Sequence, residues 1–323
     1  MIPLPHNILL SYFYFRNIDF SLLEGFTLIA DCGAFSADRL GKPVVLSDYV
    51  SWLRDWQGWF TWAASLDVIG DTEATRRNWL AARDTHGLDL VPTIHYPEKP
   101  TAMDFYAKRG VRFMGLGGLV GVRERPRGAW LAGVFKYQRE RWPGVEFHGW
   151  GVTQWPLLRF PFKSVDSSTW NAGTKFGDLT VRDPGSLRDY SVDVSRGGKP
   201  PSMAARRLLA SDHYGSCWEE IRNSRGENRT EILLVSARSA KVLEDRFNAI
   251  HAGGWFKEPL PGGRMPGQSS PARGRLHLAA GGDLGTPPQG GRQSFIVGSV
   301  LKDFQRLRDG SLARGEPWPP PDK

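Results

Sequence analysis

The chain has 323 residues, and its 40% of hydrophobic residues is enough for a substantial core, which excludes general disorder. Lysine and arginine total 42 against 34 aspartates and glutamates, so the net charge of +8 permits a polyanionic partner such as nucleic acid. Cys32 and Cys217 are too few for a disulfide framework, and no apolar run reaches the roughly 18 residues of a membrane span. We therefore expect a cytoplasmic protein without a membrane partner.

Short apolar runs dominate the first half of the chain and predict β-strands. They lack the strict alternation of half-exposed strands, which is typical of parallel strands that are buried on both faces. The seven predicted strands are Ile8–Phe15, Phe26–Asp31, Ala63–Val68, Leu88–Ile94, Val111–Leu116, Val145–Trp150 and Phe162–Asp166.

Helical patterns lie between these runs. Ser47 is expected to cap the first helix, Asp71 or Thr72 begins the second, and Gly87 ends it. Two further helices are predicted over Thr101–Arg109 and Ala129–Arg141. Strands that alternate with helices predict parallel βαβ units, and seven strands in about 160 residues favour an α/β fold of the (β/α)₈ TIM-like barrel type over an open sheet.

The second half is less regular, and residues 173–230 are interpreted as an insertion into the barrel, which spans 1–252. Gly173–Pro201 is polar and loop-like, and Glu231–Ser236 is expected to be the eighth strand. Helices are predicted over Ser202–Ala210, Trp218–Asn223 and Lys241–His251. Residues 253–323 are interpreted as a Gly- and Pro-rich excursion with a helix over Ser294–Leu307 that packs on the barrel.

Aspartates fall at the carboxyl ends of three predicted strands, where barrels carry their catalytic groups. Asp31 and Asp166 end two of these strands, and Asp67 lies near the end of a third. A carboxylate is costly to bury there unless it is paired or used in chemistry. Each could instead cap the helix that follows, but three on one rim favour a functional site.

The sequences around these aspartates form five ordered motifs. They are DCGAFS at 31–36, LDVIGD at 66–71, GLGGLVG at 115–121, FHGWGVT at 147–153 and SVDSSTW at 164–170. The set resembles the tRNA-guanine transglycosylase superfamily over roughly Ile8 to Lys175. It is most similar to the queuine tRNA-ribosyltransferase-like branch of phages and bacteria that inserts 7-deazaguanines into DNA.

The resemblance implies two catalytic residues. Asp166 matches the family's nucleophile, and Asp31 matches the aspartate that moves protons on the departing and arriving bases. Exchange without hydrolysis needs such a pair, because a carboxylate can hold the glycosyl carbon as a covalent intermediate while a second group acts as acid and base. Retaining glycosidases use two carboxyl groups in a parallel way.

The resemblance also implies a base-binding set. Asp67 matches the carboxylate that reads a guanine-type edge, and Phe35 matches the ring that stacks on the base, with Met114 or Tyr96 as candidates for the opposite wall. The remaining positions assigned to the substrate are Cys32, where the family usually has Ser, His95, where it usually has Gln, and Gly117 and Gly118, whose amides approach the base. A tight strand-to-helix turn would also explain the two glycines.

Basic residues flank these motifs and predict contacts with phosphates. Those proposed for nucleic-acid binding are Arg123, Arg125, Arg127, Lys163 and Lys175. A target base must be flipped out of a duplex or be single-stranded, and Trp155 and Trp170 are candidates for stacking on it. Solvated surface charge and core packing are the alternative roles for these residues.

No cofactor is expected. The family's structural zinc site needs three cysteines and a histidine, but Cys217 is the one cysteine of the second half, and we do not expect His213, Cys217 and His251 to form a substitute.

The leading hypothesis is a DNA base-exchange transglycosylase that replaces guanine with a 7-deazaguanine derivative. Its role would be protection of a viral genome in the host cytoplasm. Its partners would be DNA, the free 7-deazaguanine base and a possible DNA-binding protein. The alternatives are a tRNA-guanine transglycosylase and a barrel N-glycoside hydrolase that uses the same carboxylates.

Overall fold

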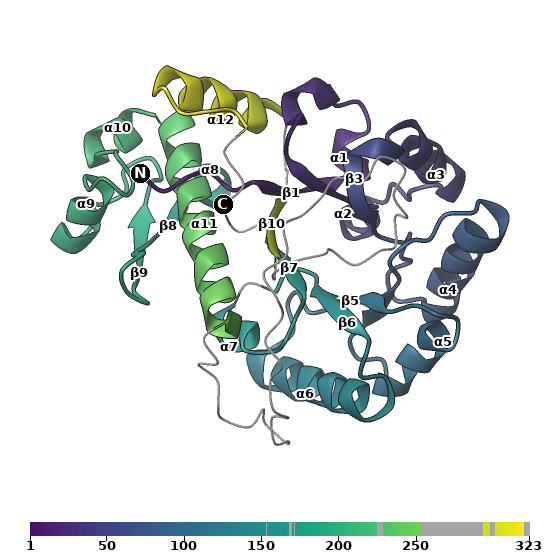
Figure 1. Cartoon of the computed structure of the whole chain (residues 1–323). Helices are drawn as coiled ribbons and strands as arrows, with labels where there is room; N and C mark the ends of the chain where they lie inside the picture. The colour runs from purple at the N-terminus through teal and green to yellow at the C-terminus, as the bar shows by residue number, and fades with distance from the viewer. Residues whose placement is uncertain are drawn as a thin grey trace.

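The computed structural model describes residues 1–152, 154–167, 170, 172–224, 229–252, 293–297 and 301–319. Its main feature is a sheet of eight parallel strands with helices arranged around it (Figure 1). The strands are β1 (Asn7–Ser11), β2 (Thr27–Asp31), β3 (Phe60–Ala63), β4 (Thr93–His95), β5 (Phe113–Gly117), β6 (Glu146–Gly149), β7 (Ser164–Ser167) and β10 (Gln293–Val297). The predicted α/β class with parallel strands is confirmed.

The strand order is β3-β2-β1-β10-β7-β6-β5-β4, and every neighbouring pair is parallel. Next to the two outermost strands, Ala64 and Val91 form an isolated parallel bridge that lies outside the named strands. There the Ser65 N–H donates to the Val91 carbonyl at 2.8 Å, and the Val91 N–H donates to the Ala63 carbonyl at 2.9 Å.

The helices that follow the first seven strands are α1 (Tyr12–Phe15), α2 (Ala34–Arg39), α3 (Leu46–Asp55), α4 (Thr72–Leu80), α5 (Met103–Ala107), α6 (Glu124–Arg141), α7 (Trp155–Leu158) and α8 (Ala172–Phe176). The helices α3 to α6 lie where the sequence predicted them, whereas α1, α2, α7 and α8 were not predicted. The helix α1 replaces the end of the predicted strand Ile8–Phe15. Asp71 caps α4 as predicted, because its carboxylate accepts the Ala74 N–H at 2.9 Å. The predicted cap at Ser47 is wrong: α3 begins at Leu46, and Val45 precedes it without a side-chain bond.

The eighth strand was placed wrongly from the sequence. Glu231–Ser236 lies in the long helix α11 (Thr230–Ala252), and β10 fills the place between β1 and β7 instead. Ser294–Leu307 is therefore not one helix: its first residues belong to β10, and α12 spans Leu301–Ala313.

The burial of α11 explains this error. Leu233 and Leu234 pack into the core beside β1 and β2, whereas Ile232 and Val235 pack into a separate core of the second half. A helix buried on opposite sides carries a continuous apolar run, which periodicity cannot distinguish from a buried strand.

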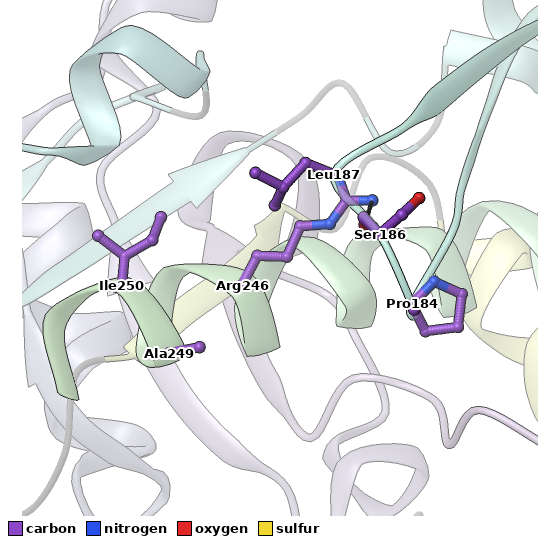
Figure 2. A pocket seen from close by; sticks show the side chains of 7 residues that line it. Pro184, Ser186, Leu187, Arg246, Ala249 and Ile250 are labelled. Carbon is purple, nitrogen blue, oxygen red and sulfur yellow. Dashed lines mark hydrogen bonds between the residues drawn. The ribbon is translucent and has the colours of Figure 1, made fainter. Parts of the chain in front are cut away.

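The region predicted as the loop Gly173–Pro201 instead contains α8 and an antiparallel hairpin, β8 (Asp178–Arg182) and β9 (Asp189–Asp193). With α9 (Met203–Leu209) and α10 (Trp218–Asn223), it forms the second core against α11. The hairpin turn and α11 line an open pocket of about 190 Å³ (Figure 2). Arg246 lines this pocket and donates to the carbonyls of Asp183, Ser186 and Arg188 at 2.8–3.1 Å, so it fixes the hairpin turn.

Among the described residues, no helix combines the length and the apolarity needed to cross a membrane.

Candidate active site

The predicted site residues come from the carboxyl ends of neighbouring parallel strands, which meet at one edge of the sheet (Figure 1). Asp31 is the last residue of β2, His95 of β4 and Gly117 of β5, and Asp166 is the third residue of β7. Asp67 follows β3 by four residues. Topology therefore brings these side chains from five strands together, as the sequence predicted.

Asp166 is held from two directions. Its Oδ1 accepts the backbone N–H of Gly151 at 2.7 Å and lies 3.4 Å from Nε2 of His148. The carboxylate is nearly buried, with 10% of its side chain exposed, and His148 is fully buried. The two neighbours therefore fix the position of Oδ1 at the strand end.

The second carboxyl group, Asp31, has a raised pKa. Burial, followed by the negative charges of Asp166 and Asp67, raises the pKa of Asp31 to about 7, against the opposing hydrogen bonds of Gly33 and Cys32. The Gly33 N–H donates to Oδ2 at 3.0 Å, and Sγ of Cys32 lies 3.8 Å from Oδ1. A carboxyl group with this pKa can hold or release a proton near neutral pH.

Cys32 supports Asp31. Its side chain is buried with 1% exposed, and burial together with the charges of Asp31 and Asp67 raises the thiol pKa well above its ordinary value. The group is therefore a thiol that contacts Asp31, whereas the resemblance assigned Cys32 to the substrate.

Asp67 and His95 form an ion pair at the same edge. His95 Nε2 lies 3.2 Å from Asp67 Oδ2, and its Nδ1 lies 3.8 Å from Glu98 Oε1, which also accepts the His95 backbone N–H at 2.9 Å. Burial opposes the charged ring, but the charge and hydrogen bond of Asp67 and the charge of Glu98 outweigh it and raise the pKa of His95. The other oxygen of Asp67, Oδ1, is buried without a hydrogen-bond partner in the described structure, so its capacity to accept a hydrogen bond is unused.

The glycines of the GLGGLVG motif lie close to Trp150, His95 and the backbone of Tyr96. A Cβ on Gly115 would lie 2.1 Å from Nε1 of Trp150, and one on Gly117 would lie 3.3 Å from the same ring and 3.2 Å from His95. Gly118 has a positive φ of 71° and lies against the backbone of Tyr96. These positions need glycine because strand β5 passes directly beneath Trp150 and His95.

Phe35 is a candidate stacking ring. It lies on α2, which begins after Gly33 at a φ of 78°, and 48% of the residue is exposed. The predicted opposite walls are not supported: Met114 is fully buried in the core, and the Tyr96 ring packs edge-on against Trp130 at 5.8 Å. Trp150 is partly exposed beside His148, at 4.2 Å between ring centroids, and is the better candidate.

The predicted phosphate contacts divide into two groups. Arg123 and Arg125 are exposed after β5, and Lys175 is exposed on α8, which follows β7. Arg127 is instead 8% exposed, and it donates to Gln154 and to the Leu119 carbonyl. Its position is that of a residue that fixes the loop after β5.

The predicted phosphate contact of Lys163 is not supported by its position. It directly precedes β7, and its Nζ lies 3.4 Å from the carboxylate of Glu146, the first residue of β6. Both residues mark the amino ends of the strands, so Lys163 lies at the edge opposite Asp166. The sequence placed it beside Asp166 because the two are close along the chain, but a strand rises about 3.3 Å per residue and separates its two ends.

The predicted stacking of Trp170 on a base is also not supported, because Trp170 is 6% exposed and packs in the core beside β1 and β2. The side chain of Trp155 lies outside the described residues.

Three site residues were missed from the sequence: Glu98, His148 and Trp150. Each had a visible signal, since Glu98 follows His95 by three residues and the other two lie in the FHGWGVT motif at the end of β6. The neighbours that give them a role lie on other strands, so spacing alone did not reveal it.

In the described part of the chain, no group of three histidine, cysteine, aspartate or glutamate side chains could hold a metal. Cys217 precedes α10 in a capping box with Glu220, and His251 contacts the Leu158 carbonyl at 2.6 Å. In comparisons with known proteins, no family model and no curated sequence matches the chain.

Proposed function

We propose that this protein is a DNA base-exchange transglycosylase that replaces guanine with a 7-deazaguanine derivative. The observation that carries the proposal is electrostatic: the charges of Asp166 and Asp67 help to raise the pKa of Asp31 to about 7, while Asp166 accepts the Gly151 N–H and lies 3.4 Å from Nε2 of His148. Two carboxyl groups whose environments differ in this way are suited to separate acid and nucleophile roles.

We also infer that the sheet is a (β/α)₈ barrel. All eight strands are parallel, and their order follows the chain, with β10 in the eighth position. The bridge between Ala64 and Val91 supports closure, because it joins the segment that follows β3 to the segment that precedes β4. A closed arrangement would direct every strand end toward one rim.

In the proposed reaction, Asp166 attacks the anomeric carbon of the target nucleotide. The bond from that carbon to the base breaks, its electron pair goes to the base, and Asp31 supplies the proton that the base takes. The incoming deazaguanine then gives its proton to Asp31 and attacks the same carbon. The bond to Asp166 breaks, and its electron pair returns to the carboxylate.

The base would bind through the pair of Asp67 and His95. Guanine presents its N1–H and exocyclic amine as adjacent donors, and Asp67 offers Oδ2 beside His95 and the unpartnered Oδ1. Adenine has no such pair of donors. With N1–H directed to Oδ2, the carbonyl O6 would fall on the side of His95, whose raised pKa favours a donating ring.

The test is base exchange with labelled substrates. The protein is incubated with DNA or tRNA that carries labelled guanine, with and without a free 7-deazaguanine, and release of the label is followed. We expect release from DNA only when the deazaguanine is present, and none in Asp166→Ala, which should still bind DNA. Release from tRNA alone would support a tRNA enzyme, and release without added base would support a hydrolase; either result contradicts the proposal.

A further inference from the structure

The structure assigns His148 and Ser164 a positioning role: together they hold Oδ1 of Asp166 so that Oδ2 is the oxygen that reacts. The inference deepens the proposed function and rests on it for the identity of the reaction. It is carried by a chain of contacts that joins β6 to β7 beneath the candidate nucleophile.

The contacts have a defined direction. His148 and Ser164 are register partners on adjacent strands, and Nδ1 of His148 lies 2.8 Å from the Ser164 Oγ. The other ring nitrogen, Nε2, lies 3.4 Å from Asp166 Oδ1. Both His148 and Ser164 are fully buried.

These contacts select one form of the ring. Nε2 faces the Asp166 carboxylate at 3.4 Å, and because a carboxylate can only accept hydrogen bonds, the form with the proton on Nε2 is favoured. Burial lowers the pKa of His148, although Asp166 opposes the shift, so the neutral ring is favoured. A neutral ring with N–H at Nε2 has a bare Nδ1, which accepts the Ser164 hydroxyl proton.

The ring itself cannot easily turn. It packs edge-on against Trp150 at 4.2 Å and against Trp62 at 5.0 Å between ring centroids. The direction of the Nε2–H bond is therefore set by Ser164 on one side and by two indoles on the others.

Both donors then converge on one oxygen. The Gly151 N–H at 2.7 Å and the His148 Nε2 at 3.4 Å both approach Oδ1, and in the described structure every polar contact of Asp166 falls on that oxygen. When Oδ2 is bonded to the sugar, Oδ1 becomes the carbonyl oxygen of an ester. The two donors would stabilise the charge that returns to the carboxylate as the incoming base attacks.

Two substitutions of His148 separate positioning from packing. Asparagine places its amide near the position of Nδ1, so it can keep the contact with Ser164 but cannot reach Asp166. Glutamine places its amide near the position of Nε2 and can restore the donor to Asp166. His6→Gln is a matched control, because His6 directly precedes β1 at the opposite edge of the sheet.

We expect His148→Asn to lower kcat for exchange by about 100-fold, with KM for DNA and for the free base changed less than about three-fold. In single-turnover experiments, both formation and breakdown of the covalent complex should slow. His148→Gln should recover at least about ten-fold of the lost rate, and His6→Gln should match the wild type. Wild-type rates in His148→Asn, or equal losses in both His148 variants while both remain folded, would overturn the inference.

A measurement without substrate distinguishes this inference from the proposed function. Nitrogen-15 NMR of the imidazole should show a neutral ring with its proton on Nε2, and Ser164→Ala should weaken that preference. A proton on Nδ1, or a charged ring near pH 7, overturns the positioning role whatever the activity. If the wild type exchanges no base but shows the expected ring, the positioning of Asp166 stands and the proposed reaction fails.

Discussion

At the residue scale, the raised pKa of Asp31 makes the stability of the folded protein depend on pH. The folded protein retains this proton up to about pH 7, whereas an unfolded chain releases it near the ordinary value of 3.8. Between these values the unfolded state binds fewer protons, so the free energy of unfolding falls as pH rises from about 4 to 7.

Asp31→Asn should remove this loss while abolishing exchange. We expect urea unfolding to show that the variant is more stable than the wild type at pH 8, by on the order of 2 kcal/mol, with a smaller difference at pH 4. A variant that is less stable than the wild type at pH 8 would show that the Asp31 carboxylate is well accommodated, against the raised pKa.

His95 gives a second prediction at this scale. Its raised pKa depends on two carboxylates, Asp67 at 3.2 Å and Glu98 at 3.8 Å. These negative charges stabilise the protonated, positively charged ring in the folded protein. His95 therefore stabilises the fold below its ordinary pKa of 6.5, and this contribution is lost as pH rises through the folded-state value.

NMR titration of His95 tests the pairing. Glu98→Gln keeps an oxygen for the His95 backbone N–H but removes the charge, so the His95 pKa should fall; Asp67→Asn should lower it further, because Asp67 is closer. An unchanged His95 pKa in Asp67→Asn would contradict the ion pair.

At the scale of elements, the packing of β5 beneath Trp150 is the sharpest constraint. A Cβ on Gly115 would lie 2.1 Å from the indole Nε1 and 3.0 Å from the hydroxyl of Thr93, with which that indole bonds. We expect Gly115→Ala to destabilise the protein by about 1–3 kcal/mol and to change the tryptophan fluorescence.

Gly133→Ala is the matched control. Gly133 lies inside α6, and the nearest atom to its added Cβ is 3.8 Å away on Pro100. This variant should be more stable than the wild type by about 0.5–1 kcal/mol, because alanine is the better helix former. Equal destabilisation by both substitutions would refute the account of Gly115.

The sequence predicted strands correctly where an apolar run was compatible with one kind of secondary structure. The runs at Phe26–Asp31 and Phe162–Asp166 are strands because a short run ending in aspartate matches a buried strand. The run at Glu231–Ser236 was compatible with a buried strand or a buried helix. It lies in the helix α11, which packs against core clusters on both of its sides. The hairpin of β8 and β9 was missed because polar residues surround its short alternation.

The site residues also divide into those that the sequence predicted and those that it did not. Strand ends gave Asp31, Asp67 and Asp166, since position in a parallel sheet determines where a strand end lies. The roles of His148 and Glu98 depend on atoms from adjacent strands and turns, which spacing does not supply. The prediction for Lys163 was wrong because its proximity to Asp166 in the sequence was taken for proximity in space.

At the scale of the whole molecule, closure of the sheet can be tested by hydrogen exchange. If the outermost strands are joined, the amides of Ser65 and Val91 should exchange as slowly as those inside β1 and β2, since each donates across the seam. Fast exchange at both positions, with slow exchange in β1, would indicate an open sheet.

The basic charge of the molecule gives a final prediction. Arg123 and Arg125 are exposed at the edge that carries Asp166, whereas Lys163 lies at the opposite edge. Replacing both arginines with glutamine should weaken DNA binding and reduce the slope of log affinity against log salt by about 1 to 2. Lys163→Gln should leave the slope unchanged, and an equal effect there would indicate diffuse attraction by net charge.

The place of β10 has a consequence for synthesis of the protein. β10 pairs with both β1 and β7, so Phe295 lies beside Asp166 and Ile296 beside Ile8. While a ribosome is still making the earlier residues, β1 and β7 each lack a neighbour, and the strand that carries Asp166 remains an unpaired edge. The strand arrangement around Asp166 is therefore complete only after residues 293–297 have emerged, so under the proposed function base exchange would begin late in translation.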